Sequence, residues 1–543
     1  MMEKRVLLAF VLSIAVVWAF QGLFMPAPPV TPPAAPVSVP ATPAPPAPAV
    51  VPPASPQAPA SPETSDIAAA GPEDATVDTT LFRAVLSNTG GVLKSFQLKA
   101  YTDAEGKAIE LVSQTAAATL GWPLGIVTGD ATLDATLAQA NFAVQTEGTE
   151  VRFEFAGNGV RAEKTLRFDP LNYQLTADTS VTNNGQNMPH RIVWRGGFGD
   201  QSIPPDPATA FGVIGTDAKF ERIGVTSVEG VMERSTTIAG VEDRYFLAAF
   251  ILPQPATVQL TKLDYTPPVA DADVVSTVSV AAPVLDQPVR IYIGPKDDNW
   301  LAMADPRLGP VVDYGYFEVI TRPLLVALLW IHSYVGNFGW AIIILTIALN
   351  TALFPLRLKQ QVSMQKMSKL QPQMRTLQDR YKKLKANDPR RAEVQSEMMN
   401  LYKQNGVNPM GGCLPLLLQM PLLFAFWNML SVSIEMRRAP WILWLKDLSQ
   451  YDPYFIIPIL MAVSMIVSTK MMPTTVDPAQ AKMMMIMPVL LTVMFLWLQS
   501  GVTLYYLTSN VVGIGQQWFI KKYWSGEDEN PKPRRGSKNK AIE

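Results

Sequence analysis

The chain has 543 residues, of which 48% are hydrophobic and 17% are charged, and its formal net charge is −1. This length leaves room for two or more domains, and the absence of a net positive charge excludes a protein that is basic as a whole, such as a typical nucleic-acid-binding protein. One cysteine, Cys413, rules out an internal disulfide framework. The two histidines, His190 and His332, are far apart in the sequence, which argues against a zinc site or a histidine-based catalytic triad. We therefore expect no metal, no cofactor and no enzymatic activity.

The N-terminal segment, residues 1–25, is predicted to be a transmembrane anchor. Lys4 and Arg5 precede an apolar run from Val6 to Met25, and about 20 apolar residues cross a bilayer as a helix. A cleavable signal peptide begins in the same way, but it usually has a shorter apolar core and a small-residue cleavage site. Because this run ends in bulky residues, we favour an uncleaved anchor whose basic flank stays in the cytoplasm.

Two segments of different composition follow the anchor. Residues 26–75 are rich in Pro, Ala and Val, which predicts an extended linker that cannot pack a core. Residues 76–300 contain short alternating runs such as VRFEFAG, separated by turn signals such as Asn183–Gly185. Period-two alternation with regular turns predicts an enlarged antiparallel β-sandwich. We find no clustered acid/base pair and no Gly-rich phosphate loop in it, so we expect a binding or scaffolding module.

The rest of the chain predicts a helical membrane domain. Residues 301–336 should form a connector that ends in a short amphipathic helix, with Trp330 and His332 at the level of the lipid headgroups. Together with the anchor, five apolar stretches make six transmembrane helices and a five-helix core. These stretches are residues 337–356, 411–432, 453–470, 485–499 and 502–520, and between and after them lie a basic helical hairpin (357–410), a loop (433–452), a second loop (471–484) and a basic tail (521–543).

The distribution of charge predicts the orientation of these segments. With the basic N-terminus inside, the alternation of spans puts the β domain and residues 433–452 in the periplasm, and the hairpin, the 471–484 loop and both termini in the cytoplasm. The hairpin carries twelve Lys or Arg against four acids between Arg357 and Gln404, as the excess of basic residues in cytoplasmic loops requires. The outer 433–452 loop contains PWILWLKDL, which we expect to lie in the interface through Trp441 and Trp444.

The basic hairpin allows three interpretations that charge alone does not separate. It is a solvated face that follows the positive-inside rule, a surface attracted to anionic lipid, or a contact for an anionic partner such as ribosomal RNA. Pro372 should kink or interrupt its first helix. The candidate contact residues are Lys366, Lys369, Arg375, Arg380, Lys382 and Lys383.

Polar side chains within the predicted spans are the candidate site, because such groups are costly in a bilayer and usually face a bundle interior or a wet cavity. The polar candidates are Thr346, Asn350, Gln419, Asn428, Tyr505, Tyr506, Thr508 and Asn510, of which we place Thr346, Asn350, Gln419, Tyr506 and Asn510 in one groove. Thr346 and Asn350 are four residues apart and share one helix face. Hydrogen bonds between helices would explain these residues, and so would a polar groove open to the cytoplasm. No acidic residue lies within the six spans, which argues against a proton-coupled transporter.

Several longer strings resemble the YidC-type membrane protein insertases, in the bacterial form with a large periplasmic domain. They include YIGPKDDNWL from Tyr292, WIHSYVGNFGWAIIILT, EMMNLYKQNGVNPMGGCLPLLLQMPL, DLSQYDPYFIIPILM and SGVTLYYLTSN. They occur in the family's order and cover about Tyr292 to Tyr523. The likeness is specific, since no single short motif carries it.

The resemblance implies a multi-pass protein of the bacterial inner membrane that inserts, folds and helps assemble membrane proteins, alone or with the Sec translocon. It implies a hydrophilic groove open to cytoplasm and lipid, with Thr346 and Tyr506 in it. The family commonly has an arginine at the position of Asn350, and we expect Arg357, further along, to lie at the cytoplasmic border as a poor substitute. The implied partners are nascent membrane proteins, the Sec translocon and lipids, with the ribosome as a further candidate and no small-molecule substrate.

Two other functions fit part of the pattern. A transporter or channel would show solute flux in liposomes, although the spans lack acids and a transporter-like repeat. A pure assembly scaffold would act through the β domain. Deletion of Thr76–Asp271 discriminates between these views, because an insertase should largely survive it and a scaffold should not.

Overall fold

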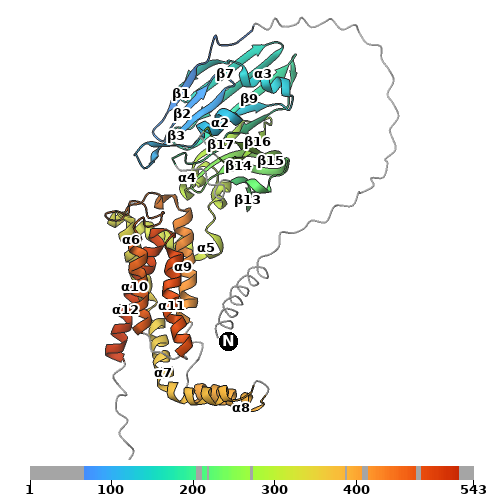
Figure 1. The fold of residues 1–543 in the computed structure, drawn as a ribbon. Coiled ribbons are helices and arrows are strands. Elements are labelled where there is room, and N and C mark those ends of the chain that lie inside the picture. Colours follow the sequence, from blue (N-terminus) through green and yellow to red (C-terminus); the bar gives the residue numbers. More distant parts are fainter. Residues whose placement is uncertain are drawn as a thin grey trace, which may run out of the picture. The chain divides into compact units, whose positions relative to one another are not determined.

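The computed structural model describes residues 66–202, 211–216, 219–268, 273–385, 388–405, 414–471 and 478–524. The predicted anchor, the linker up to residue 65, Cys413 and the tail from residue 525 onward lie outside these ranges. The described part of the chain is β-rich up to residue 295 and helical after it (Figure 1).

The β-rich part contains two sheets, and all strands that pair in them are antiparallel. The smaller, four-stranded sheet has the order β1 (Asp74–Asp78), β2 (Phe82–Ser87), β3 (Val92–Thr102) and β4 (Ala108–Glu110). The larger sheet has 13 strands, in the order β13-β12-β14-β15-β17-β9-β8-β7-β6, with β10 beside β9 and β11 between β16 and β5. Its strands are β5 (Gly125–Val127), β6 (Ala143–Glu147), β7 (Glu150–Gly157), β8 (Val160–Phe168), β9 (Gln174–Asn183), β10 (Gln186–Asn187), β11 (Arg191–Trp194), β12 (Phe211–Thr216), β13 (Lys219–Gly224), β14 (Val231–Glu242), β15 (Phe246–Tyr265), β16 (Val275–Pro283) and β17 (Val289–Pro295).

The long strand β15 explains how the larger sheet forms an enlarged sandwich. Its first part, Phe246–Ile251, pairs with β17, and its last part, Gln259–Tyr265, pairs with β16. The predicted alternation of buried and more exposed side chains is present, since every second residue of β8 is buried. The predicted β-sandwich is therefore confirmed. Its first strand begins at Asp74, two residues before the predicted boundary at residue 76.

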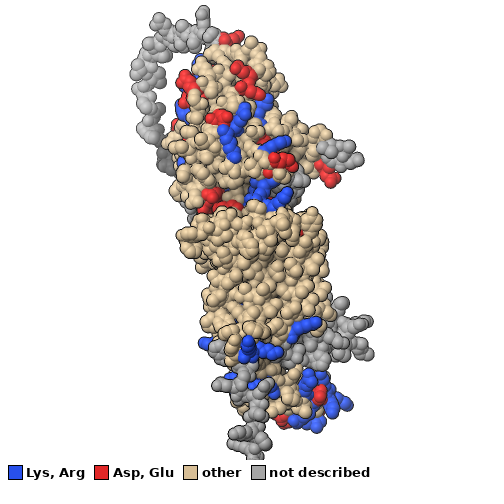
Figure 2. Space-filling view, turned by 90° about the vertical axis from the view of Figure 1, so that its left-hand side faces the viewer, with Lys and Arg blue, Asp and Glu red and all other residues tan. Residues whose placement is uncertain are grey.

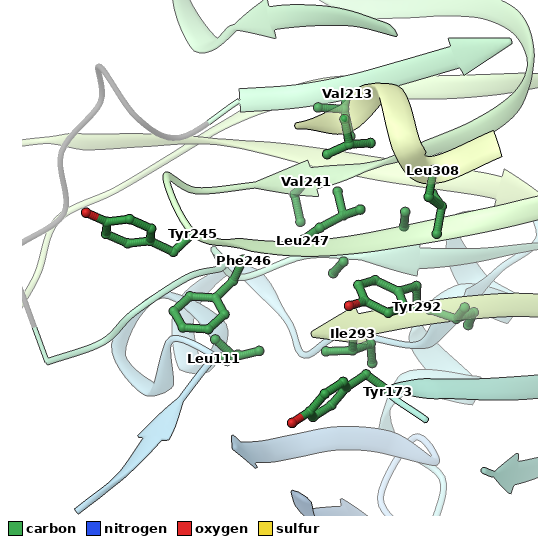
Figure 3. Close-up of a cluster of buried hydrophobic side chains, with 14 of the residues drawn as sticks. Leu111, Tyr173, Val213, Val241, Tyr245, Phe246, Leu247, Tyr292, Ile293 and Leu308 are labelled. Carbon is green, nitrogen blue, oxygen red and sulfur yellow. The ribbon is translucent and has the colours of Figure 1, made fainter. Parts of the chain in front are cut away.

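The string YIGPKDDNWL has a packing role at the end of the β domain. Tyr292 is fully buried beside Tyr173 (Figure 3), and its hydroxyl donates to the Pro295 carbonyl at 2.6 Å. A Cβ on Gly294 would lie 2.5 Å from the Cβ of Tyr173, so only glycine fits this close approach. Asp297 then caps the helix that follows, α4, by accepting hydrogen bonds from two of its backbone amides.

A buried lysine joins the two sheets. Lys164 on β8 is 1% exposed, and its Nζ donates to the carbonyl oxygens of Gly91 at 2.8 Å and Leu124 at 2.6 Å. Among the described residues, no carboxylate forms an ion pair with it. Burial lowers the pKa of Lys164 to about 7, because a charged amine is costly away from water.

Shorter helices lie within and directly after the β domain, and longer ones follow. The short ones are α2 (Gln114–Leu120), α3 (Ala131–Gln139), α4 (Asp298–Ala304) and the 3-10 turns Val225–Ser227, Pro306–Val311, Gly315–Phe317 and Ile434–Met436. The longer ones are α5 (Glu318–Val335), α6 (Phe338–Ala352), α7 (Phe354–Lys383), α8 (Arg390–Gln404), α9 (Leu414–Val432), α10 (Ile456–Met471), α11 (Pro478–Phe495) and α12 (Ser500–Trp524).

The predicted span at residues 337–356 is broken rather than continuous. The axes of α6 and α7 meet at an angle of 58° around Leu353. Pro355 lies in the first turn of α7, where a backbone N–H has no partner within the helix, so proline is tolerated there. In a continuous helix from α6, the same proline would remove a backbone hydrogen bond. Pro372 does not interrupt its helix, because α7 runs through that residue to Lys383, and a kink there stays a prediction.

The six predicted spans are only partly matched by the helices. Within the described residues, the segment Gly315–Val335 alone is long and apolar enough to cross a membrane, and the bent pair α6–α7 would be a second. The qualifying segment includes α5, which we predicted to lie in the interface. α10 and the Met485–Phe495 part of α11 are apolar but shorter. The count of six spans therefore stays a prediction.

The segment at residues 433–452, called here the α9–α10 loop, closes one end of the helical bundle. The backbone amide of Ser500 donates to Gln450 at 2.6 Å, and that of Gly501 donates to Leu448 at 3.0 Å. These bonds tie the loop to the start of α12. Trp441 packs with its side chain against Gly339 of α6, and its predicted place in the membrane interface stays a prediction.

We predict that Gly339→Ala displaces the α9–α10 loop. A Cβ at this position would lie 2.1 Å from Cδ1 of Trp441, and overpacking of this kind costs about 1–3 kcal/mol. Gly515→Ala in α12 is the matched control, since a Cβ there meets nothing within 4 Å. Thermal unfolding should show a lower midpoint for Gly339→Ala and no loss for Gly515→Ala. Equal midpoints would contradict the packing described.

We predict that Lys164 makes the stability of the β domain depend on pH. Between about pH 7 and the ordinary lysine pKa of 10.5, the unfolded chain holds a proton that folded Lys164 has released. The free energy of unfolding therefore rises as the pH rises through this window, and the gain is absent below it. Hydrogen exchange of the β8 amides, corrected for its intrinsic pH dependence, measures this slope. Lys164→Met should flatten it and destabilise the domain by about 1–3 kcal/mol through two unpaired carbonyls. Lys219→Met, at an exposed position, should keep the slope.

Candidate functional site: polar contacts in the helical bundle

α12 carries polar side chains on two neighbouring faces, and each face contacts different helices. Residues four, seven or eleven positions apart lie on the same side of a helix. The first face holds Tyr505, Ser509 and Gln516, and the second holds Tyr506, Asn510 and Gln517.

Asn350 connects α6 to the first face of α12. It is 3% exposed, and its side-chain Oδ1 accepts a hydrogen bond from the Ser509 hydroxyl at 3.2 Å. Its backbone carbonyl accepts a second bond from Nε2 of Gln516 at 3.0 Å. Thr346, which is fully buried one turn earlier, donates to the carbonyl of Ile342 within its own helix at 2.6 Å.

Gln419 connects α9 to the same face. Its Nε2 donates to the Tyr505 hydroxyl at 2.6 Å. The Tyr505 ring is 1% exposed and stacks on Phe426 with ring centroids 4.1 Å apart. Three helices, α6, α9 and α12, thus meet through side-chain amides and hydroxyls rather than through apolar contacts alone.

Arg357 adds a positive charge to this group. Its Nη1 donates to Oε1 of Gln516 at 3.2 Å, and its Nη2 lies 3.5 Å from Oε1 of Gln419. A Cβ on Gly513 would lie 3.4 Å from the same Nη1, so the missing side chain makes room for the guanidinium. Among the described residues, no carboxylate pairs with Arg357. The guanidinium thus contacts α9 and α12 just beyond the bend at Leu353, and the expectation that Arg357 lies at the cytoplasmic border as a poor substitute stays a prediction. We call Asn350, Arg357, Gln419, Tyr505 and Gln516 the polar cluster.

The second face of α12 contacts α10 and α11 instead. Nδ2 of Asn510 donates to the Ser464 hydroxyl at 3.3 Å, and the ring of Tyr506 lies 5.4 Å from that of Phe495. The five predicted residues therefore do not form one group, since Tyr506 and Asn510 lie apart from the contacts made by Asn350 and Gln419. Sequence reasoning named Tyr505 as a polar residue of the spans without placing it in the groove, and it missed Ser509 and Gln516, although their spacing of four and seven residues from Tyr505 and from each other was the available signal.

The six candidate residues of the basic hairpin are exposed on α7. Of these, Arg380 forms an ion pair with Glu397 of α8 at 3.1 Å between two exposed side chains, which contributes little to stability. Figure 2 shows Lys and Arg gathered at the hairpin, while a wide band of the helical part shows none on the face drawn. The predicted hairpin of two helices is present as α7 and α8.

Comparison with known proteins gives two matching families that adjoin along the chain. Residues 74–327 match the family described as "YidC periplasmic domain", and residues 330–527 match "60Kd inner membrane protein". The boundary between them falls within α5.

Similar proteins match over nearly the whole chain. A "Membrane protein insertase YidC" of Citrifermentans bemidjiense is 36% identical over 96% of this chain and 99% of its own length. The protein of the same name from Syntrophus aciditrophicus is 34% identical over 96% of this chain and 100% of its own. A solved structure, "Active YidC insertase crystal structure with the first transmembrane domain resolved", is 19% identical, covers 82% of this chain and 92% of that one, and has a TM-score of 0.36. On the identity and coverage of these relatives, the chain belongs to the YidC family of membrane proteins.

Proposed function

We propose that this chain is a membrane protein insertase and chaperone that acts without covalent catalysis. Its relatives carry the name of membrane protein insertases. The observation that carries the proposal is the polar cluster, in which a half-buried Arg357 has no carboxylate partner among the described residues and lies among side-chain amides of an otherwise apolar bundle.

The mechanism follows from the cost of moving polar groups into a bilayer. A substrate segment that must cross the bilayer loses its hydrogen bonds to water, and each unpaired group costs several kcal/mol. Glutamine, asparagine and tyrosine side chains at the border of a bundle offer replacement partners and lower this barrier. The burial of the substrate's apolar segment in lipid then supplies the driving force.

Arg357 gives the proposed groove a charge that Asn350 does not. A guanidinium stays protonated at all physiological pH values and binds carboxylates through two parallel hydrogen bonds. Its present partners are neutral glutamine oxygens. A substrate carboxylate would replace them, because a charged acceptor binds a guanidinium more strongly than a neutral one. We infer that acidic residues in a substrate's polar segment bind at Arg357, with Gln419 and Gln516 holding the guanidinium in place.

The sidedness of the proposed mechanism rests on charge. The hairpin and the basic residues Lys521 and Lys522 of α12 occur at the ends of α7 and α12 that lie away from the α9–α10 loop. We propose that this basic end faces the cytoplasm of a bacterium, that both termini lie there, and that the β domain is periplasmic. The partners we propose are nascent membrane proteins, the Sec translocon and, through the hairpin, the ribosome.

The prediction compares charge and polarity at two positions in a depletion–complementation assay. Arg357→Gln should impair substrates that carry acidic residues in the translocated segment, because it removes the cation and keeps an amide. Asn350→Leu should impair all substrates that need a polar cluster, and Asn350→Ala should be milder. Asn350→Arg combined with Arg357→Gln should restore acidic substrates, since it returns the charge to the same cluster.

Reconstitution provides the control for this series. Insertion of a short single-span substrate into liposomes that contain the purified chain separates insertion from other causes of poor growth. Lys366→Gln, which removes an exposed charge from α7, should leave insertion of acidic and neutral substrates equal to wild type. Normal insertion of every substrate by Asn350→Leu and by Arg357→Gln would refute the role given to the polar cluster.

A further inference from the structure

The α9–α10 loop contacts the β domain through an arginine that the proposed insertion mechanism does not use. Arg437 forms an ion pair with Asp200, and the two side chains are 6% and 2% exposed. Its Nη1 also donates to the carbonyl of Thr102 at 3.1 Å. The guanidinium lies 5.7 Å from the centre of the Phe246 ring, within reach of a cation–π contact. All these partners belong to the β domain.

The acceptor for Arg437 is rigidly built. Oδ1 of Asp200 accepts hydrogen bonds from the backbone amide and the hydroxyl of Ser202, which leaves Oδ2 to face the arginine. The backbone amide of Asp200 donates to Oδ2 of Asp243 at 2.8 Å. Because bonds within the β domain already fix the Asp200 carboxylate, its side chain loses little conformational freedom when it pairs with Arg437.

A second contact between the same two parts brings two carboxyl groups together. Glu435 of the loop lies within hydrogen-bonding reach of Asp297, the residue that caps α4. One Glu435 oxygen also accepts from the Ser433 hydroxyl at 2.9 Å. Asp297 also accepts hydrogen bonds from the amides of Asn299 and Trp300. Two half-buried carboxylates this close repel each other unless they share one proton.

The surroundings of Glu435 favour the protonated form. Burial, followed by the neighbouring Asp297, raises its pKa above the ordinary value of 4.5. The other titratable groups that act on or feel Glu435 are the phenols of Tyr101 on β3 and Tyr314 in the connector, and burial raises the pKa of both. Arg437, two residues further along the loop, is already paired with Asp200.

We propose that the α9–α10 loop and the β domain are held together by a two-part polar contact, in which the Arg437–Asp200 ion pair fixes the docking and a proton shared between Glu435 and Asp297 makes the docking stronger in acid than in base. The loop is also bonded to the first turn of α12 through Leu448 and Gln450. The contact therefore connects the β domain to the helix that carries much of the polar cluster.

The direction of the pH effect follows from the raised pKa of Glu435. The docked state binds a proton more tightly than the undocked state does, so docking is favoured as the pH falls. The advantage is complete below the ordinary glutamate pKa of 4.5 and is lost as the pH rises through the raised value of the docked state. Arg437 stays charged throughout, so the ion pair does not contribute to this change.

The test measures docking in the full-length chain in lipid nanodiscs. Cys413→Ser removes the native thiol, and spin labels are attached through cysteines at Leu171 of the β domain and Leu443 of the loop, which are 75% and 81% exposed. Double electron–electron resonance then measures the distribution of distances between the two labels, and from it the fraction of molecules in the docked state. Arg437→Ala should lower this fraction several-fold, whereas Lys446→Ala, at an exposed basic residue of the same loop, should leave it unchanged.

Charge exchange separates the ion pair from a general loss of structure. Arg437→Asp and Asp200→Arg should each undock the β domain, and the double variant should restore most of the docked fraction. A double variant that is as undocked as either single one would overturn the role given to this pair, provided that Lys446→Ala remains docked. Insertion activity is not part of this readout, so failure here is distinct from failure of the proposed function.

The pH profile tests the shared proton. In the wild type, the docked fraction should be larger at about pH 5 than at about pH 8. Glu435→Gln should stay docked and lose this difference, because its amide donates to Asp297 at every pH. A wild type with equal docking at both pH values, or a Glu435→Gln variant that keeps the wild-type profile, would overturn the proposal.

Discussion

A polar side chain inside an apolar helical bundle has no water to bond, so its partner has to come from the backbone of its own helix or from a neighbouring helix. This constraint governs the arrangement around α12, which carries polar residues on two of its faces. One face bonds to Asn350 of α6 and Gln419 of α9, and the other bonds to Ser464 of α10. The pairing orients α12 relative to three helices at once, which apolar contacts alone would leave less strictly defined.

The bend between α6 and α7 turns this packing into a charged site. In a straight helix, Arg357 would lie on the same face as Asn350 and nearly two turns beyond it. Pro355 starts a new helix at an angle of 58° to the first, and the guanidinium reaches Gln516 and the space left by Gly513. A charge thus enters the polar cluster from outside the helix that carries Asn350. The chain lacks an arginine at residue 350, and the bend supplies one from residue 357.

At the opposite end of the bundle, polar groups also find fixed partners, but in a loop and in the β domain rather than in neighbouring helices. The α9–α10 loop meets the start of α12 through backbone bonds, meets α6 through Trp441 on Gly339, and meets the β domain through Arg437. Polar contacts of this kind are specific in geometry, since each buried charge has a fixed partner. The string YIGPKDDNWL, which carries much of the family likeness, ends the β domain and supplies Asp297 to that contact.

The sequence by itself determined the β-sandwich, the helical hairpin with its exposed basic residues and the family, because alternation, composition and long shared strings are local properties of the chain. It also identified Asn350 and Gln419 as polar residues of the bundle. Only the tertiary structure decided that Tyr505 rather than Tyr506 bonds to Gln419, that Pro355 rather than Pro372 breaks the helix line, and that Arg357 joins the cluster. Successive residues of a helix point about 100° apart around its axis, so neighbouring polar residues such as Tyr505 and Tyr506 contact different helices. The reach of a long side chain across a bend depends on the angle between two helices, and no local pattern encodes that angle.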